Sequence, residues 1–126
     1  MYIITFEPIP EWLLDALEEA SRQILIELRI PEKLIGFEYL VCAVSQTAEN
    51  PHRTAYITKD LYPDIARLYR TNGACVERSM RTAVQACWSN PSGRAALEQI
   101  AGFRLTSRPA NAAFIDIVAE YIRSHM

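Results

Sequence analysis

The sequence has few of the residues on which metal and disulfide chemistry depends. Its three cysteines, Cys42, Cys75 and Cys87, lack CxxC spacing, and its two histidines, His52 and His125, stand alone. A zinc site needs about four clustered ligands, so we expect no metal, no cofactor and free thiols that pack as small apolar groups. A catalytic Cys/His pair stays open as an alternative. The sequence supplies no constellation for it, and we expect a protein that is not an enzyme.

Long apolar runs are also missing. No stretch of about 18 or more apolar residues occurs, which predicts no transmembrane helix. Residues 1–7 lack the basic start, apolar stretch and small-residue cleavage site of a signal peptide. We therefore expect a cytoplasmic protein with no membrane partner. The length of 126 residues and the 50% apolar composition predict one domain with one core.

The net charge is only −2, and it conceals an uneven distribution. Residues 1–49 hold nine acidic and three basic side chains, whereas residues 50–126 hold six acidic and ten basic ones. Six of those ten basic residues lie between Arg53 and Arg81. A basic half that follows an acidic first helix predicts one face suited to phosphate. Such a modest patch predicts low affinity unless a second copy contributes.

Helical periodicity runs through the chain and predicts an all-α six-helix bundle. The predicted helices cover residues 10–29, 32–48, 57–70, 74–89 and 93–101, and a last helix that Asn111 caps. Pro31 separates the first two helices, and Gly102 ends the fifth. Trp12 is expected on the buried side of the first helix. Residues 2–6 are the only candidate strand.

Residues 62–88 have the pattern of two helices joined by a tight turn, Thr71-Asn72-Gly73. Apolar residues recur at helical spacing in the second helix, at Val76, Met80, Ala83, Val84, Cys87 and Trp88. Glu77, Arg78, Arg81 and Gln85 fall on the opposite face. This pattern is typical of a helix-turn-helix, whose second helix enters the major groove of DNA. An ordinary amphipathic hairpin with solvated arginines has the same periodicity, so both interpretations stay open at this point.

Four phrases of the sequence are distinctive: Leu61-Tyr62-Pro63-Asp64-Ile65-Ala66, Val76-Glu77-Arg78, Ala86-Cys87-Trp88-Ser89, and Asn111 through Phe114-Ile115 to Val118-Ala119. With these phrases the chain resembles the DNA-binding effector domains of the sporulation-initiation master response regulators of spore-forming Firmicutes. The likeness begins near residue 19. We expect an effector domain over residues 19–126, preceded by an extension, residues 1–18, that leads into the first helix. The resemblance favours a helix-turn-helix made by helices at about 57–70 and 74–89.

The resemblance implies a sequence-specific transcription regulator, associated with the nucleoid, that reads a short T-G-N-C-G-A-A-like box in double-stranded DNA. The family's base-reading positions correspond here to Glu77, Arg78 and Arg81. Arginine donates a bidentate fork to guanine, and glutamate accepts from cytosine, so the chemistry fits. The residues expected at the DNA backbone are Thr71, Asn72, Arg70, Gln85 and Arg108. Arg67, on the first helix of the pair, fits backbone contact and solvation equally well.

Two protein partners are also expected. A second copy would pair on DNA through a dimer face made of Phe114, Ile117 and Tyr121. The resemblance implies that residues 89–105 face the RNA polymerase sigma factor. Residues 73–75, Gly-Ala-Cys, depart from the family, whose members carry polar or basic side chains there. This departure supports the alternative, a receiver-less interaction module or antagonist that keeps the fold and binds DNA weakly. Residues 2–14 do not resemble the family's receiver domain, which leaves the input signal open.

Overall fold

The computed structural model describes residues 10–125, and these residues form six α-helices without a strand. The helices are α1 (Glu11–Glu27), α2 (Ile35–Glu49), α3 (Tyr62–Leu68), α4 (Gly73–Ser89), α5 (Pro91–Ala101) and α6 (Asn111–His125). A 3-10 segment, η1 (Pro51–Tyr56), and a single π-helical turn, η2 (Ile57–Leu61), lead into α3. The predicted all-α six-helix fold is confirmed. The candidate strand at residues 2–6 lies outside the described residues.

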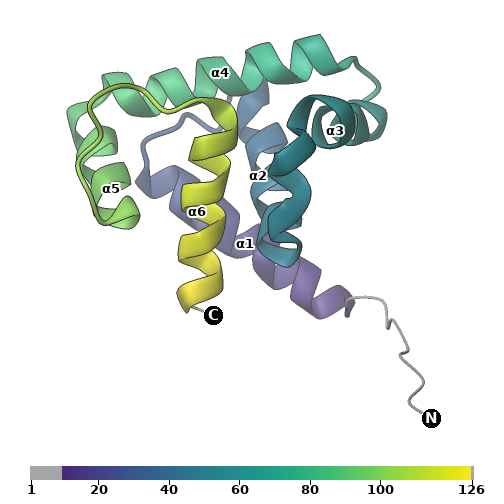
Figure 1. The fold of residues 1–126 in the computed structure, drawn as a ribbon, viewed down its shortest axis with the longest axis horizontal. Helices are drawn as coiled ribbons and strands as arrows, with labels where there is room; N and C mark the ends of the chain where they lie inside the picture. Colours follow the sequence, from purple (N-terminus) through teal and green to yellow (C-terminus); the bar gives the residue numbers. More distant parts are fainter. Residues whose placement is uncertain (1–9, 126) are drawn as a thin grey trace.

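Helix α4 lies across the ends of α2 and α6, with α3 beside one of its ends and α5 beside the other (Figure 1). Both α2 and α6 begin where they meet α4. Gly36 in the first turn of α2 lies against Ser79 of α4, and Asn111 at the start of α6 bonds to the backbone of Glu77. The molecule therefore presents the outer side of α4 at the end of the bundle, away from the other helices.

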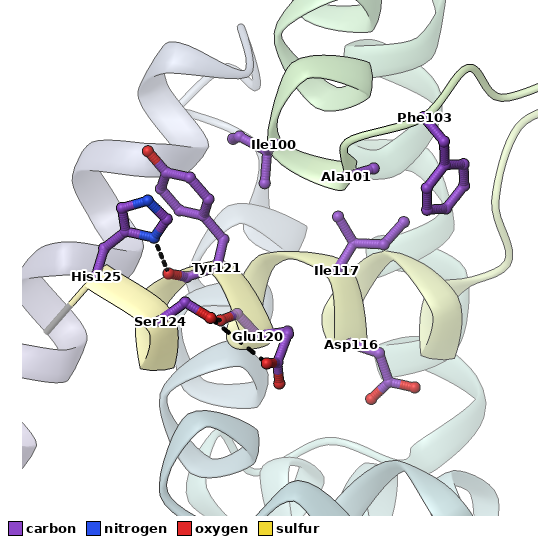
Figure 2. A pocket seen from close by; sticks show the side chains of 9 residues that line it. All are labelled: Ile100, Ala101, Phe103, Asp116, Ile117, Glu120, Tyr121, Ser124 and His125. Carbon is purple, nitrogen blue, oxygen red and sulfur yellow. Dashed lines mark hydrogen bonds between the residues drawn. The ribbon is translucent and has the colours of Figure 1, made fainter.

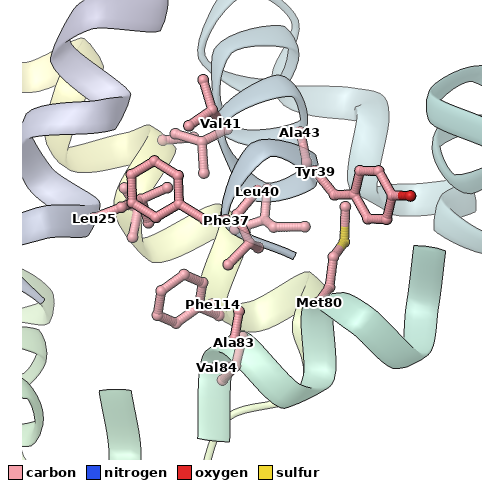
Figure 3. Packing of buried hydrophobic residues seen from close by; sticks show 14 of the residues in the cluster. Leu25, Phe37, Tyr39, Leu40, Val41, Ala43, Met80, Ala83, Val84 and Phe114 are labelled. Atoms are coloured by element: carbon pink, nitrogen blue, oxygen red, sulfur yellow. The ribbon is translucent and has the colours of Figure 1, made fainter. Parts of the chain in front are cut away.

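Helix α2 forms the centre of the hydrophobic core. Its side chains Phe37 and Leu40 are fully buried and pack among Leu25 of α1, Met80 of α4 and Phe114 of α6 (Figure 3). Each large apolar side chain removed from water contributes about 1.5 to 3 kcal/mol to folding. Helix α2 thus packs against three other helices, α1, α4 and α6, through buried apolar side chains.

The predicted apolar stripe of α4 is confirmed. The exposed fraction is at most 1% for each of Val76, Met80, Ala83, Val84 and Cys87, and only Trp88 is partly exposed.

The prediction for Trp12 was wrong, because this side chain is 70% exposed. The buried part of α1 begins at Leu17, and within residues 10–125 no other helix covers the side of its first turns where Trp12 lies.

Two helices end in the same motif, with an arginine in the left-handed conformation. Arg29 follows α1 with φ 64°, and Arg70 follows α3 with φ 54°. The next backbone N–H then donates backwards, from Ile30 to Leu25 over 3.2 Å and from Thr71 to Ala66 over 2.9 Å. This pattern is a Schellman ending, which usually has glycine at the left-handed position. It ends α3 at Leu68, two residues before the predicted end.

The start of α3 also differs from the prediction. Residues 57–61 form a π turn because Pro63 has no N–H to continue the α-helical pattern, and the N–H of Tyr62 donates to Ile57 five residues back. Helical structure thus does begin at the predicted residue 57, but the α-helical part is confined to Tyr62–Leu68.

We expect Gly36→Ala to lower the free energy of unfolding by about 2 to 3 kcal/mol, because the added methyl group is forced against backbone. A Cβ at Gly36 would lie 2.1 Å from the Ser79 carbonyl oxygen. Gly73→Ala is the matched control, since its Cβ would meet only the Tyr62 Cβ at an ordinary 3.6 Å. It should be neutral or stabilise by up to about 1 kcal/mol. Urea midpoints measure both, and equal midpoints would contradict the close helix crossing.

Candidate nucleic-acid interface

The exposed side of α4 carries polar and cationic side chains opposite the buried stripe. Arg78, Arg81 and Gln85 are exposed, and Glu77 is partly exposed beside them. The helix begins where the Asn72 side chain accepts a hydrogen bond of 2.9 Å from the N–H of Cys75. Such a side-chain cap satisfies one of the first-turn donors and fixes the start of the helix. The four predicted α4 residues therefore lie together on one solvent-facing side.

Glu77 and Arg81 form an ion pair along this face, with the Arg81 Nη1 3.1 Å from the Glu77 Oε1. Both side chains are exposed enough for water to screen them, so an i,i+4 pair of this kind contributes only about 0.3 to 0.5 kcal/mol. A competing partner can therefore separate them at little cost. Among residues 10–125, Arg78 has no ion-pair partner, which leaves its guanidinium free.

The segment between α5 and α6 brings Arg108 to the same face. The Arg108 Nη1 donates to the Gln85 Oε1 over 3.2 Å, although the two residues are 23 positions apart. Arg108 also lines a shallow cavity of about 390 Å³ together with Glu77 and Arg81. The structure thus brings together four residues that the sequence placed in two separate regions.

This segment is held in place by two side chains of α5. Glu98 accepts a hydrogen bond of 2.7 Å from the Leu105 N–H, and the Arg94 Nη2 donates to the Leu105 carbonyl over 3.2 Å. The Arg94 guanidinium also lies 4.0 Å from the centre of the Trp88 ring, a cation–π contact with the end of α4. The path of the chain leading to Arg108 is therefore tied to α4 and α5.

The turn between α3 and α4 supplies the other predicted backbone-contact residues. Arg70 is exposed, Thr71 is partly exposed, and Asn72 is exposed at the start of α4. Because the Asn72 oxygen caps the helix, only its NH₂ group is available to an outside acceptor. The N–H groups of Gly73 and Ala74 lie in the first turn of α4, where the helix itself provides no acceptor.

A separate ion-pair cluster engages Arg67, whose role the sequence left open. Asp64 forms ion pairs with both Arg67 and Arg53, and the Arg53 Nη2 lies 2.6 Å from the Asp64 Oδ2. The Arg67 side chain remains 73% exposed. These arginines stabilise the approach to α3 locally, and they are less free than Arg78.

The sequence interpretation missed the role of Asn111. It was expected to cap the last helix; it is the first residue of α6 and is only 8% exposed. Its amide donates to the Tyr62 hydroxyl and to the Glu77 carbonyl, over 3.0 Å in each case. Burial raises the pKa of Tyr62, and the hydrogen bond from Asn111 partly offsets that rise. No local sequence pattern reveals a contact across 49 and 34 residues.

The thiols of Cys42, which is partly buried, and Cys87, which is buried, are poorly suited to nucleophilic chemistry. Burial raises the pKa of Cys87 to about 12, and burial also raises the pKa of Cys42. A thiol in this state stays protonated at neutral pH, whereas the thiolate is the nucleophile. Within the described residues, no three His, Cys, Asp or Glu side chains gather as they would around a metal ion.

The prediction for the dimer face needs a correction at one residue. Phe114 has no exposed surface and belongs to the core, so it cannot contact a second copy. Ile117 and Tyr121 are partly exposed and line a groove of about 350 Å³ between α6 and the end of α5 (Figure 2). They remain a prediction for the dimer face.

No helix within residues 10–125 combines the length and apolar composition of a membrane-spanning segment.

Residues 21–122 match the protein family described as the C terminal of sporulation initiation factor Spo0A. The match covers α2 to α5 completely and almost all of α6, so it includes the exposed face of α4 and Arg108. The chain belongs to the Spo0A C-terminal family, whose members are DNA-binding effector domains of transcription regulators.

Proposed function

We propose that this protein is a sequence-specific transcription regulator whose α3 and α4 act as a helix-turn-helix on a T-G-N-C-G-A-A-like box. The observation that carries the proposal is the single exposed face on which Glu77, Arg78, Arg81 and Arg108 lie together. In this arrangement α3 positions the pair against the DNA, and α4 enters the major groove.

The dimensions and chemistry of α4 support base reading. Its 17 residues span about 25 Å, and the major groove, roughly 12 Å wide, admits one α-helix. Arg78 has a free guanidinium, which suits bidentate donation to the O6 and N7 of guanine. Arg81 and Glu77 are held together only weakly, so Arg81 turns to a second guanine and Glu77 accepts from a cytosine amino group.

The turn before α4 supports a different kind of contact. Arg70 offers a positive charge to a phosphate. The first-turn N–H groups of Gly73 and Ala74 form the positive end of the α4 dipole, where anions bind. Small side chains at these two positions let a phosphate approach the backbone closely. These backbone N–H groups would replace part of the phosphate binding that polar side chains provide in the family.

Arg108 supports contact on the other flank of α4. Its hydrogen bond to Gln85 sets the guanidinium beside the helix, where the edge of a groove would carry a phosphate. Few cations are involved in total, so one copy should bind with low affinity and a shallow salt dependence, and both should increase when a second copy contributes.

Two protein contacts complete the proposal. Ile117 and Tyr121 supply the pairing surface for a second copy on DNA. The segment from residue 89 to 105 faces the RNA polymerase sigma factor, and its Phe103 side chain is 59% exposed. Phe103 also lines the groove beside Ile117, which continues the apolar surface from α6 onto this segment.

The central prediction concerns Arg78. Arg78→Ala should weaken binding to the box by about 1 to 3 kcal/mol and relax sequence preference, because the guanine fork is lost. Arg78→Lys is the matched control, since it keeps the charge without the planar fork. It should retain the salt dependence of wild-type binding and still lose most of the discrimination. Fluorescence anisotropy with labelled duplexes, with and without the box, at two salt concentrations measures both quantities.

If the wild-type protein binds duplexes with and without the box with the same low affinity, the base-reading proposal is refuted. That result would favour the alternative of an interaction module or antagonist. The alanine variant loses the charge of Arg78 and the lysine variant keeps it. If both bind non-box DNA with the same affinity and salt dependence, Arg78 does not lie near DNA.

A second prediction separates the backbone role of Arg70 from its charge. Arg70→Gly and Arg29→Gly should each raise the free energy of unfolding by up to about 1 kcal/mol, because glycine adopts the left-handed conformation without strain. Only Arg70→Gly should weaken DNA binding, with the salt slope reduced by about one. Thermal unfolding and salt titrations measure the two effects. A matching loss of DNA affinity in Arg29→Gly would contradict the assignment of Arg70 to phosphate.

A further inference from the structure

Asn111 joins three helices through one buried side chain. Its Nδ2 group donates both of its hydrogens, one to the Tyr62 hydroxyl of α3 and one to the Glu77 carbonyl of α4, while Asn111 itself begins α6. Both distances are 3.0 Å, and only 8% of the residue is exposed. Every donor of the amide is therefore used inside the protein, between the two helices of the pair.

The hydrogen bond to the Glu77 carbonyl holds the part of the α4 backbone from which the exposed face begins. This carbonyl belongs to the residue that begins the exposed face, next to Arg78 and one turn before Arg81. Tyr62, Glu77, Arg81 and Asn111 all line the same cavity. A hydrogen bond at this point therefore acts on the backbone that carries the proposed base-reading side chains.

We propose that Asn111 is a positioning residue for DNA reading, which fixes the rotation and height of α4 relative to α3 and α6. The inference rests on the function proposed above. The hydrophobic driving force around Met80 and Ala83 is not directional, so by itself it does not specify the exact rotation of a helix about its axis. A hydrogen bond weakens steeply as its geometry departs from linear, so the two bonds of Asn111 restrain that rotation. Base edges are read by paired hydrogen bonds, which require side chains placed with the same accuracy.

The chemistry of the amide distinguishes this role from simple filling of space. Asn111→Asp keeps the shape and replaces two donors by acceptors, one of which would face the Glu77 carbonyl. Tyr62→Phe removes only one of the two acceptors and leaves the bond to Glu77. We therefore expect loss of DNA discrimination to increase in the order Tyr62→Phe, Asn111→Ala, Asn111→Asp.

Binding to box and non-box duplexes by these three variants tests the proposal. Ser21→Ala is the matched control, because the Ser21 hydroxyl is fully buried, donates to the Leu17 carbonyl over 2.7 Å and lies 3.3 Å from the Ser45 hydroxyl, between α1 and α2. Asn111→Ala should reduce the ratio of box to non-box affinity about tenfold while leaving the non-box salt slope unchanged. Ser21→Ala should lose comparable thermal stability and keep the ratio.

Full discrimination by folded Asn111→Ala would overturn the proposal, and so would an equal loss in Ser21→Ala. If Asn111→Ala fails to fold, Tyr62→Phe, which removes one of the two hydrogen bonds, carries the same comparison with Ser21→Ala. An unchanged ratio of box to non-box affinity in folded Tyr62→Phe would then overturn the positioning role.

A readout that needs no DNA separates this inference from the proposed function. The amide of Asn111 favours the ionised phenol, so Asn111→Ala should raise the pKa of Tyr62, with Glu77 and Arg81, the charged groups that also act on it, left in place. NMR of labelled tyrosine follows this pKa. An unchanged pKa would show that the contact itself is absent. A raised pKa in a protein whose wild type does not distinguish the box would refute the proposed function instead.

Discussion

The arrangement of the molecule depends on the close crossing of α2 and α4, where Gly36 lies against the backbone of Ser79. Because there is no side chain at this point, the two helix backbones approach closely enough for the core to form between them. Met80 and Ala83 of α4 then lie against the central helix α2. The opposite side of α4, with Arg78 and Arg81, is turned outward as a consequence. Helix packing therefore determines which charges reach solvent.

The residues that stabilise the fold differ from those proposed to recognise DNA. Fully buried apolar side chains from α1, α2, α4 and α6 supply the folding energy, whereas the ion pairs near the exposed face are solvent-screened and contribute little. Weak ion pairs suit the DNA-binding surface proposed for α4, because Glu77 and Arg81 lose little when they change partners. The buried polar contact of Asn111 connects the two parts, since it lies under the exposed face and holds the α4 backbone.

The elements with strong periodicity could be predicted closely. The α4 stripe from Val76 to Cys87 was correct residue by residue, because one face of a long amphipathic helix must meet the core. Errors arose where periodicity does not say what lies opposite. Trp12 continues an apolar pattern, but within residues 10–125 no helix covers it. Phe114 is a residue type that interfaces often use, but here it is fully buried in the core. The shortened α3 follows from Pro63 and from Arg70, which adopts the left-handed conformation. Sequence patterns predict that conformation at glycine, so they did not place the end of α3 at this arginine.

The sequence by itself determined the number of helices, the two faces of α4, the uneven charge and the family to which the chain belongs. These properties follow from neighbours along one helix or from motifs read in order. Only the tertiary structure decided that Arg108 reaches Gln85 across 23 residues, and that Asn111 reaches Tyr62 across 49 and Glu77 across 34. Such contacts depend on the path of the α5–α6 segment and on the angles at which helices cross. Hydrophobic periodicity predicts which face of a helix is buried, but it does not predict which distant residues that face will contact.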